Sequence, residues 1–191
     1  MQAVMLSIHP RRCELIANGK EKIEVRKTKP KIEIPFKVYI YCTQYRLIDY
    51  INYGYGLNMP AGMVIGEFIC DYILKDLIGE YEDVLERDGR MTRAEQKIYG
   101  QDKPLYGWHI SNLKIYDKPR ELNEFITLDK EAIRQCEHRF QSYYRFTEGG
   151  YIKNGFECDK DDTWCFNCKR KRLVRPPQSW CYVGEVNEIY D

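Results

Sequence analysis

Long hydrophobic runs are missing from this sequence. The chain of 191 residues contains no window that approaches the ~18 apolar residues needed for a membrane-spanning helix. The first residues, Met1 to Ile8, are apolar, but they lack a basic segment before them and a small-residue cleavage site after them, and Pro10 follows at once. We therefore expect no membrane span, no secretory signal and a cytoplasmic location.

The chain also lacks an excess of either charge, internal repeats and low-complexity tracts. Its 30 Lys and Arg residues nearly balance 29 Asp and Glu residues, and 43% of the residues are hydrophobic. This composition is typical of a globular protein and excludes disorder. A chain of this length buries about 70% of the surface that its unfolded form exposes, so the main core needs neither disulfides nor a metal.

Charge is nevertheless distributed unevenly along the chain. Residues 1–46 contain ten basic and four acidic residues, residues 67–102 contain ten acidic and five basic residues, and residues 165–175 contain five basic residues and no acid. Such segregation is typical of a protein that attracts a polyanion to one side. The alternative is that most of these side chains form an ordinary solvated surface.

Period-two patterns and β-branched or aromatic residues predict about six strands. They cover Ala3–Ser7, Lys22–Lys27, Lys37–Thr43, Met63–Leu74, Leu105–Tyr116 and Ser179–Val186. Short helices are predicted at Pro10–Asn18 before Gly19, at Arg93–Tyr99 after a Thr92/Glu95 capping box, and at Lys130–Phe140 after Asp129.

This arrangement favours a single α+β domain over residues 1–191, whose sheet curls into a small β-barrel, because the strands do not alternate strictly with helices. Residues 142–177 are polar, contain Gly and Cys, and show no hydrophobic period. We interpret them as an insertion before the last strand.

The strongest local motif joins the end of the first helix to a charged strand. Lys20 and Lys22 follow Gly19 in a loop, and strand alternation places Glu24 and Arg26 on one face. Glu24 can accept a hydrogen bond from an exocyclic amine or an imide, and the guanidinium of Arg26 can bind a carbonyl or a phosphate. The alternative is a cross-strand ion pair on an exposed sheet.

The sequence resembles the ASCH domain family, which belongs to the PUA-like superfamily. The family signature Gly-x-Lys-x-x-Glu-x-Arg is met by Gly19, Glu24 and Arg26, although Glu21 stands at the lysine position. The blocks LSIHP, VYIYCT, VIGEF, YGWHISNLKIYDKPRELNEF and RPPQSWCYV are similar to ASCH proteins of bacteria and their phages. The resemblance implies a PUA-like barrel that binds RNA or a modified nucleobase in a cleft beside the signature.

One enzyme branch of that family hydrolyses acylated cytidine nucleosides. Its catalytic set has a lysine where this chain has Glu21 and a threonine where this chain has Glu24. A carboxylate replaces neither an amine nor a hydroxyl in that role. We therefore expect no such amidohydrolase activity and favour binding.

Further ligand contacts are predicted on two of the other blocks. Trp108 is a candidate platform on which a base stacks, and Ser179 and Trp180 are candidates for the mouth of the cleft. The alternative for Trp108 is a side chain packed in the barrel core.

The eight cysteines fall into two groups. Cys13, Cys42 and Cys70 lie in apolar patterns and are interpreted as core residues. The spacing of Cys165 and Cys168 is that of a zinc knuckle. We predict a structural zinc ion bound by Cys158, Cys165, Cys168 and Cys181, with Cys136 and His138 as alternatives for the fourth ligand. Without zinc, these are ordinary reduced thiols in an insertion ordered by aromatic packing.

A basic run, Lys169, Arg170, Lys171 and Arg172, follows the knuckle. It suits contact with a phosphate backbone, or it is a solubilising surface. The leading hypothesis is therefore a nucleic-acid-binding module for RNA or a modified nucleobase. The alternatives are a small nucleoside amidohydrolase or ribonuclease, and a phage or host regulatory protein that binds another protein through the acidic segment from Glu80 to Asp88.

Overall fold

The computed structural model describes residues 2–46, 58–76, 82–101, 103–128, 145–147, 150–152, 173 and 175–184. Within them the fold is α+β, and most strands belong to two sheets. The larger sheet has the order β10-β1-β3-β4-β7, with β1 (Gln2–Ile8), β3 (Phe36–Cys42), β4 (Val64–Cys70), β7 (Ser111–Arg120) and β10 (Trp180–Gly184). The smaller sheet has the order β2-β6-β5, with β2 (Ile23–Arg26), β5 (Ile73–Asp76) and β6 (Leu105–His109). A separate antiparallel pair joins β8 (Arg145–Thr147) to β9 (Gly150–Ile152).

The described helices are short. They are α1 (Pro10–Ala17), α3 (Glu82–Arg87), α4 (Arg93–Gly100) and the 3-10 turn η2 (Leu122–Glu124). Two sequence signals are confirmed: Gly19 adopts φ +65° just after α1, and Thr92 and Glu95 form the capping box of α4. The sequence patterns did not predict α3, which lies in the acidic segment, and the helix predicted at 130–140 lies outside the described residues.

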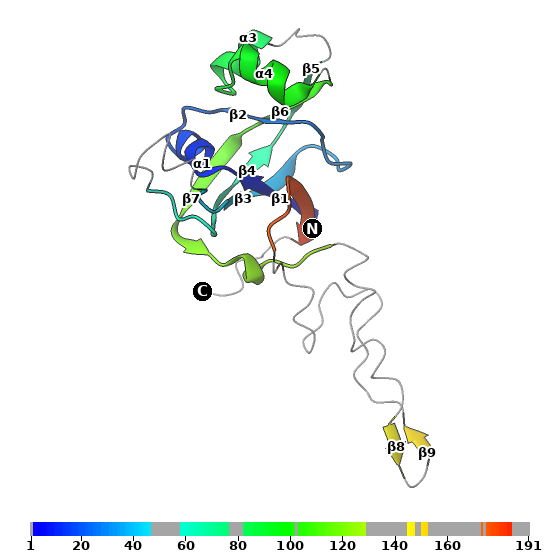
Figure 1. The fold of residues 1–191 in the computed structure, drawn as a ribbon. Coiled ribbons are helices and arrows are strands. Elements are labelled where there is room, and N and C mark those ends of the chain that lie inside the picture. The colour runs from blue at the N-terminus through cyan, green and yellow to red at the C-terminus, as the bar shows by residue number, and fades with distance from the viewer. Residues whose placement is uncertain are drawn as a thin grey trace.

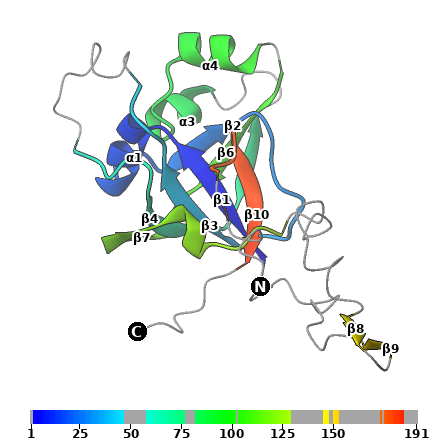
Figure 2. The ribbon, with the colours of Figure 1, turned by 60° about the horizontal axis from the view of Figure 1, so that its bottom comes forward.

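The order of the elements follows from one parallel pairing. β1 pairs with β3 in parallel, so the chain has to cross over between them, and this connection contains α1 and β2. The remaining pairs of both sheets are antiparallel. β2 belongs to the smaller sheet, where it pairs with β6 below α3 and α4 (Figure 1). Figure 2 shows β10 and β1 running side by side, with β3 beyond them.

The core surrounds strand β1, which is buried on both faces. Val4, Leu6 and Ile8 belong to one hydrophobic cluster, whereas Ala3 and Met5 belong to a second cluster on the opposite face. The first cluster also contains Cys13, Cys42 and Cys70, which confirms that these three thiols are core residues. A third, smaller cluster joins β2 and β6 to α3.

Two strands that were each predicted as continuous are broken at a corner between the sheets. The segment Met63–Leu74 divides at Asp71 and Tyr72, and the segment Leu105–Tyr116 divides at Ile110. In both cases one half pairs in the larger sheet and the other half in the smaller sheet. In the first segment Phe68, Cys70, Tyr72 and Leu74 keep one alternation through the corner, so the pattern alone did not show that break.

The barrel predicted from the sequence is not closed by hydrogen-bonded strands in the described part of the chain. β10 and β2 are edge strands of the two sheets and form no ladder with each other; a side-chain hydrogen bond instead joins β10 to the segment after β2, where Trp180 Nε1 donates to Thr28 Oγ1 at 3.0 Å. The α+β class is confirmed, but the strands form two sheets joined at a corner. Among the described residues, no helix has the length and apolar character to cross a membrane.

Candidate functional site

The signature strand β2 is buried along its whole length. Ile23 and Val25 face the cluster under α3, whereas Glu24 and Arg26 point to the other side, toward β1. Glu24 is 5% exposed and Arg26 is 8% exposed. The prediction that the two charges share a face is confirmed. The alternative of an exposed cross-strand pair is wrong, because both residues lie on one buried strand.

Arg26 connects β2 to β1 and to the segment that leads into β10. Its Nε lies 3.1 Å from Glu24 Oε1, its Nη2 donates to the Ser7 carbonyl oxygen at 2.5 Å, and its Nη1 approaches Ser179 Oγ at 3.5 Å. Each of the two Nη atoms carries two N–H groups, so one N–H group on each is left for a ligand, whereas Nε has no hydrogen-bond partner among the described residues.

Glu21 lies two residues before β2 and is 1% exposed. Arg12 of α1 lies 3.0 Å from its Oε1 and donates to the carbonyl oxygens of Gly89 and Arg90. Burial, followed by the charge of Glu24, raises the pKa of Glu21 to about 10, although the nearby Arg12 acts in the opposite direction. Arg12 therefore joins α1 to the turn after α3, and burial favours the protonated form of Glu21.

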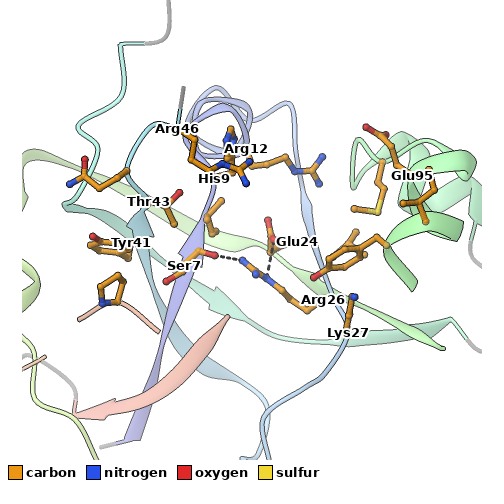
Figure 3. A pocket seen from close by; sticks show the side chains of 17 residues that line it. Ser7, His9, Arg12, Glu24, Arg26, Lys27, Tyr41, Thr43, Arg46 and Glu95 are labelled. Carbon is orange, nitrogen blue, oxygen red and sulfur yellow. Dashed lines mark hydrogen bonds and ion pairs between the residues drawn. The ribbon is translucent and has the colours of Figure 1, made fainter. Parts of the chain in front are cut away.

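A pocket of about 920 Å³ opens beside the Glu24 and Arg26 face. This volume falls within the range of small-molecule sites. Figure 3 shows Glu24 and Arg26 in its middle, His9, Arg12 and Arg46 near α1, and Glu95 on the side of α4. Further polar lining comes from Ser7, Lys27, Tyr41, Thr43 and Gln44.

The wall on the side of α4 is partly apolar. It consists of Met91, Ile98 and Tyr99. Ile98 is 76% exposed, which is high for an isoleucine beside a pocket. The ammonium of Lys27 lies 4.8 Å from the centre of the Tyr99 ring. A flat apolar group bound here would contact the isoleucine and the tyrosine together.

The pocket carries a net positive charge. Four cations line it, Arg12, Arg26, Lys27 and Arg46, against the carboxylates Glu24 and Glu95. Glu95 accepts hydrogen bonds from the Thr92 backbone N–H and hydroxyl, both at 2.8 Å, and these bonds lower its pKa. Its charge is thus partly satisfied by the end of α4, and the pocket suits an anion.

The predicted contact residues divide into those near the pocket and those away from it. Ser179 reaches Arg26, but the exposed Lys20 and Lys22 do not line the pocket. Trp108 is fully buried and packs edge-on against Phe36 at 5.8 Å. The stacking-platform interpretation of Trp108 is therefore wrong, since its ring has no open face.

Trp180 is half-buried, and its ring packs near Trp108 and Tyr182. It lies against the core and does not line the pocket. The side chain lies between β10 and the segment after β2, where its Nε1 donates to Thr28 Oγ1.

The predicted zinc site falls largely outside the described residues. Cys158, Cys165 and Cys168 lie there, as do the alternative ligands Cys136 and His138 and the basic run from Lys169 to Arg172. Cys181 is described: it is half-buried on β10 opposite Met5. In the part of the chain that is described, no three Cys, His, Asp or Glu side chains gather as metal ligands. The zinc ion stays a prediction.

Sequence reasoning missed most of the pocket lining. Arg12, Arg46, Met91 and Ile98 come from four separate segments, and none of them belongs to a motif. The available signal was the excess of basic residues in residues 1–46, which supply all four of the pocket's Lys and Arg side chains.

Comparison with known proteins identifies the fold. Neither a protein-family model nor a curated protein matches the chain. Among solved structures, ASCH from Zymomonas mobilis aligns with a TM-score of 0.51 and 16% identity, over 70% of this chain and 80% of that one. Two variants of the same protein, one with a Ser-to-Ala and one with a Tyr-to-Phe substitution, align with the same TM-score and identity, over 64% and 70% of this chain and 75% and 82% of theirs. At this identity the match speaks for architecture, and the chain has the fold of the ASCH domain.

Proposed function

We propose that the pocket binds RNA, or a modified nucleobase carried by RNA, one nucleotide at a time. The observation that carries this proposal is the pairing of two unlike walls around one cavity: a cationic wall that includes Arg26 and Arg46, and an apolar wall at Ile98 and Tyr99. A nucleotide has the same two parts, a phosphate and a flat base. The sequence resemblance to ASCH proteins and the shared fold support RNA as the polymer.

The roles of the residues follow from their contacts. Glu24 is an acceptor for an exocyclic amine or imide of the base, and the unused N–H groups of Arg26 are donors to a carbonyl or a phosphate oxygen. Lys27 is exposed and sits over Tyr99, so it can follow a phosphate while the ring supports the base. Such contacts provide affinity with little dependence on sequence.

The test is a salt series with fluorescently labelled single-stranded RNA. The logarithm of the binding constant should fall linearly with the logarithm of salt concentration, by about 0.7 for each phosphate contact. A double variant, Lys27→Ala with Arg46→Ala, should lower this slope by about 1.4 and weaken binding.

The matched control is Lys20→Ala with Lys22→Ala. It removes the same number of charges from the same basic segment, at exposed positions outside the pocket. This control should bind RNA as the parent does. Equal losses in both double variants would mean that diffuse surface charge, not the pocket, binds RNA. Binding that does not depend on salt would favour a protein partner instead.

A further inference from the structure

Three carboxylate oxygens beside the pocket are buried and have no hydrogen-bond donor among the described residues. They are both oxygens of Glu21 and Oε2 of Glu24. Buried polar atoms in folded proteins nearly always have a partner, since an unsatisfied one keeps the full cost of its lost hydration. The contacts of Arg12 and Arg26 with these glutamates are close in distance but lack hydrogen-bond geometry for these atoms.

After burial, the charge of Glu24 is the largest cause that raises the pKa of Glu21, which places the two carboxylates close to each other. Ionised carboxylates only accept hydrogen bonds, so two of them cannot bond directly. One proton between them turns one group into a donor and satisfies an oxygen of each.

We propose that Glu21 and Glu24 share one proton in the folded protein, and that this proton gives the pocket the charge with which it binds a terminal phosphate dianion. The phosphate part rests on the function proposed above, whereas the shared proton does not.

The other donors near Glu21 and Glu24 have partners of their own, so a proton held between the two carboxyl groups is the best remaining donor. Arg12 from α1 and Arg26 from β2 favour ionised carboxylates, but Arg12 also serves two backbone carbonyls. Cys13 from α1 donates to the Ile8 carbonyl oxygen, and Cys42 from β3 donates to that of Thr43.

The surrounding charges agree with this assignment. Burial raises the pKa of Cys13, so that thiol remains neutral. On the side of the turn after α3, Arg90 donates to the Lys20 carbonyl oxygen. The raised pKa of Glu21, with burial as its first cause and Glu24 as its second, points the same way.

The proton changes the charge of the pocket by one. The four lining cations are opposed by Glu95 and by the pair. With the proton, the pair carries one negative charge and the sum is +2; without it, the sum is +1. A phosphomonoester carries nearly two negative charges at neutral pH, so the protonated pocket matches a terminal phosphate, such as that of a nucleoside 5′-monophosphate.

The proton can be tested without any ligand. In protein labelled with ¹³C at the glutamate carboxyl carbons, one resonance of the pair should keep a protonated chemical shift at pH 7 and titrate several units above ordinary glutamates. Glu21→Gln and Glu24→Gln assign the two resonances. Titration of both carboxyls near the ordinary pKa of glutamate would overturn the shared proton.

The phosphate is tested with adenosine 5′-monophosphate by calorimetry at pH 7.5 and pH 10.5. Glu21→Gln keeps a donor toward Glu24 and cannot lose it, so its affinity at pH 7.5 should lie within about twofold of the parent. Between the two pH values the parent should weaken on the order of tenfold more than the variant, because it gains one negative charge beside the ligand. Equal pH dependence in the two proteins would overturn the link between proton and phosphate.

The matched control is Glu95→Gln, which removes a carboxylate from the same pocket but not from the pair. Glutamine is compatible with the capping box. This variant should bind the nucleotide more tightly at both pH values and keep the pH dependence of the parent. No binding by any of the proteins would overturn the phosphate assignment and speak against the proposed function, while the carboxyl titration would still decide the proton.

Discussion

Two regions of this molecule use the same side chains in opposite surroundings. Beside the pocket, Arg12 and Arg26 face Glu21 and Glu24 at about 3 Å, and all four side chains are largely or fully removed from water. In the helical layer, which α3 and α4 form, Arg93 lies 2.5 Å from Asp83 and 3.8 Å from Glu86, and these side chains are largely exposed. The shortest distance belongs to the exposed region.

The distance between the charged groups therefore does not predict how much each pair contributes to stability, because that contribution depends on hydration. Water screens the exposed pairs, and each partner keeps its hydration if the other is removed. In the buried region, loss of one partner leaves a charge that neither water nor another group compensates. The same substitution should have very different effects in the two regions.

The largest effect is expected for Arg26→Ala. This change leaves Glu24 without its cation and the Ser7 carbonyl oxygen without its donor. Breaking a buried pair from one side costs about 3–5 kcal/mol, and we expect a loss of free energy of unfolding of this order. Urea denaturation at pH 7 measures it. A loss within the experimental error would mean that the pair does not stabilise the fold.

Arg26→Lys separates the ligand from the fold. An ammonium keeps the positive charge beside Glu24 but cannot reproduce the planar fork. We expect a smaller loss of stability than for alanine, together with weaker RNA binding in the salt series. RNA affinity equal to that of the parent in both variants would remove Arg26 from the binding site.

The second effect concerns the pH dependence of stability. Glu21 has its pKa raised from 4.5 to about 10 in the folded protein. Below pH 4.5 both folded and unfolded chains hold this proton, whereas between 4.5 and 10 only the folded chain does. The stabilisation is therefore full at low pH and declines as the pH rises toward 10, with a slope of up to about 1.4 kcal/mol per pH unit.

Comparison with Glu21→Gln isolates this group from the others that titrate. From pH 6 to pH 9 the parent should lose free energy of unfolding relative to the variant. Parallel curves for the two proteins would show that Glu21 has an ordinary pKa. Glu95→Gln serves as the exposed counterpart: its carboxyl has a lowered pKa, so the parent should lose stability relative to this variant only as the pH falls below the ordinary range of glutamate.

The sequence predicted features whose interacting residues are close along the chain, and it did not predict those that depend on tertiary contacts. Local chemistry predicted α1, the stop at Gly19 and the capping box of α4, because the partners lie within a few residues. Alternation also placed Glu24 and Arg26 on one face of β2. The sequence did not reveal that this face is buried, since Ser7 and Ser179 reach Arg26 only through the tertiary fold.

The same limit explains the misassigned residues. Trp108 has a side chain on which a base could stack. In the fold, however, it lies on β6 of the smaller sheet and packs against Phe36 in the core. Lys20 and Lys22 are next to the signature in sequence but do not line the pocket, whereas Arg46 does. Proximity along the chain was a poor guide where the chain folds back.

A third, smaller effect is expected for Thr92→Ala in the helical layer. Its hydroxyl accepts from the Glu95 backbone N–H at 3.3 Å as part of the capping box. Loss of such a cap costs about 1 kcal/mol. Thermal denaturation should show a modest decrease in the melting temperature, much smaller than that of Arg26→Ala.

The smallest effect is expected for Arg93→Ala, despite the shortest ion-pair distance in the comparison. The side chain of Arg93 is 60% exposed and that of Asp83 is 82% exposed, and pairs of this kind contribute between about 0 and 1 kcal/mol. We expect a change below about 0.5 kcal/mol that disappears in 1 M salt, where charges are screened within a few ångströms. This substitution also tests whether burial explains the difference between the two regions. If Arg93→Ala destabilised the protein as much as Arg26→Ala, burial would not be what separates the two regions, and the helical layer would have to carry part of the fold's stability through this arginine.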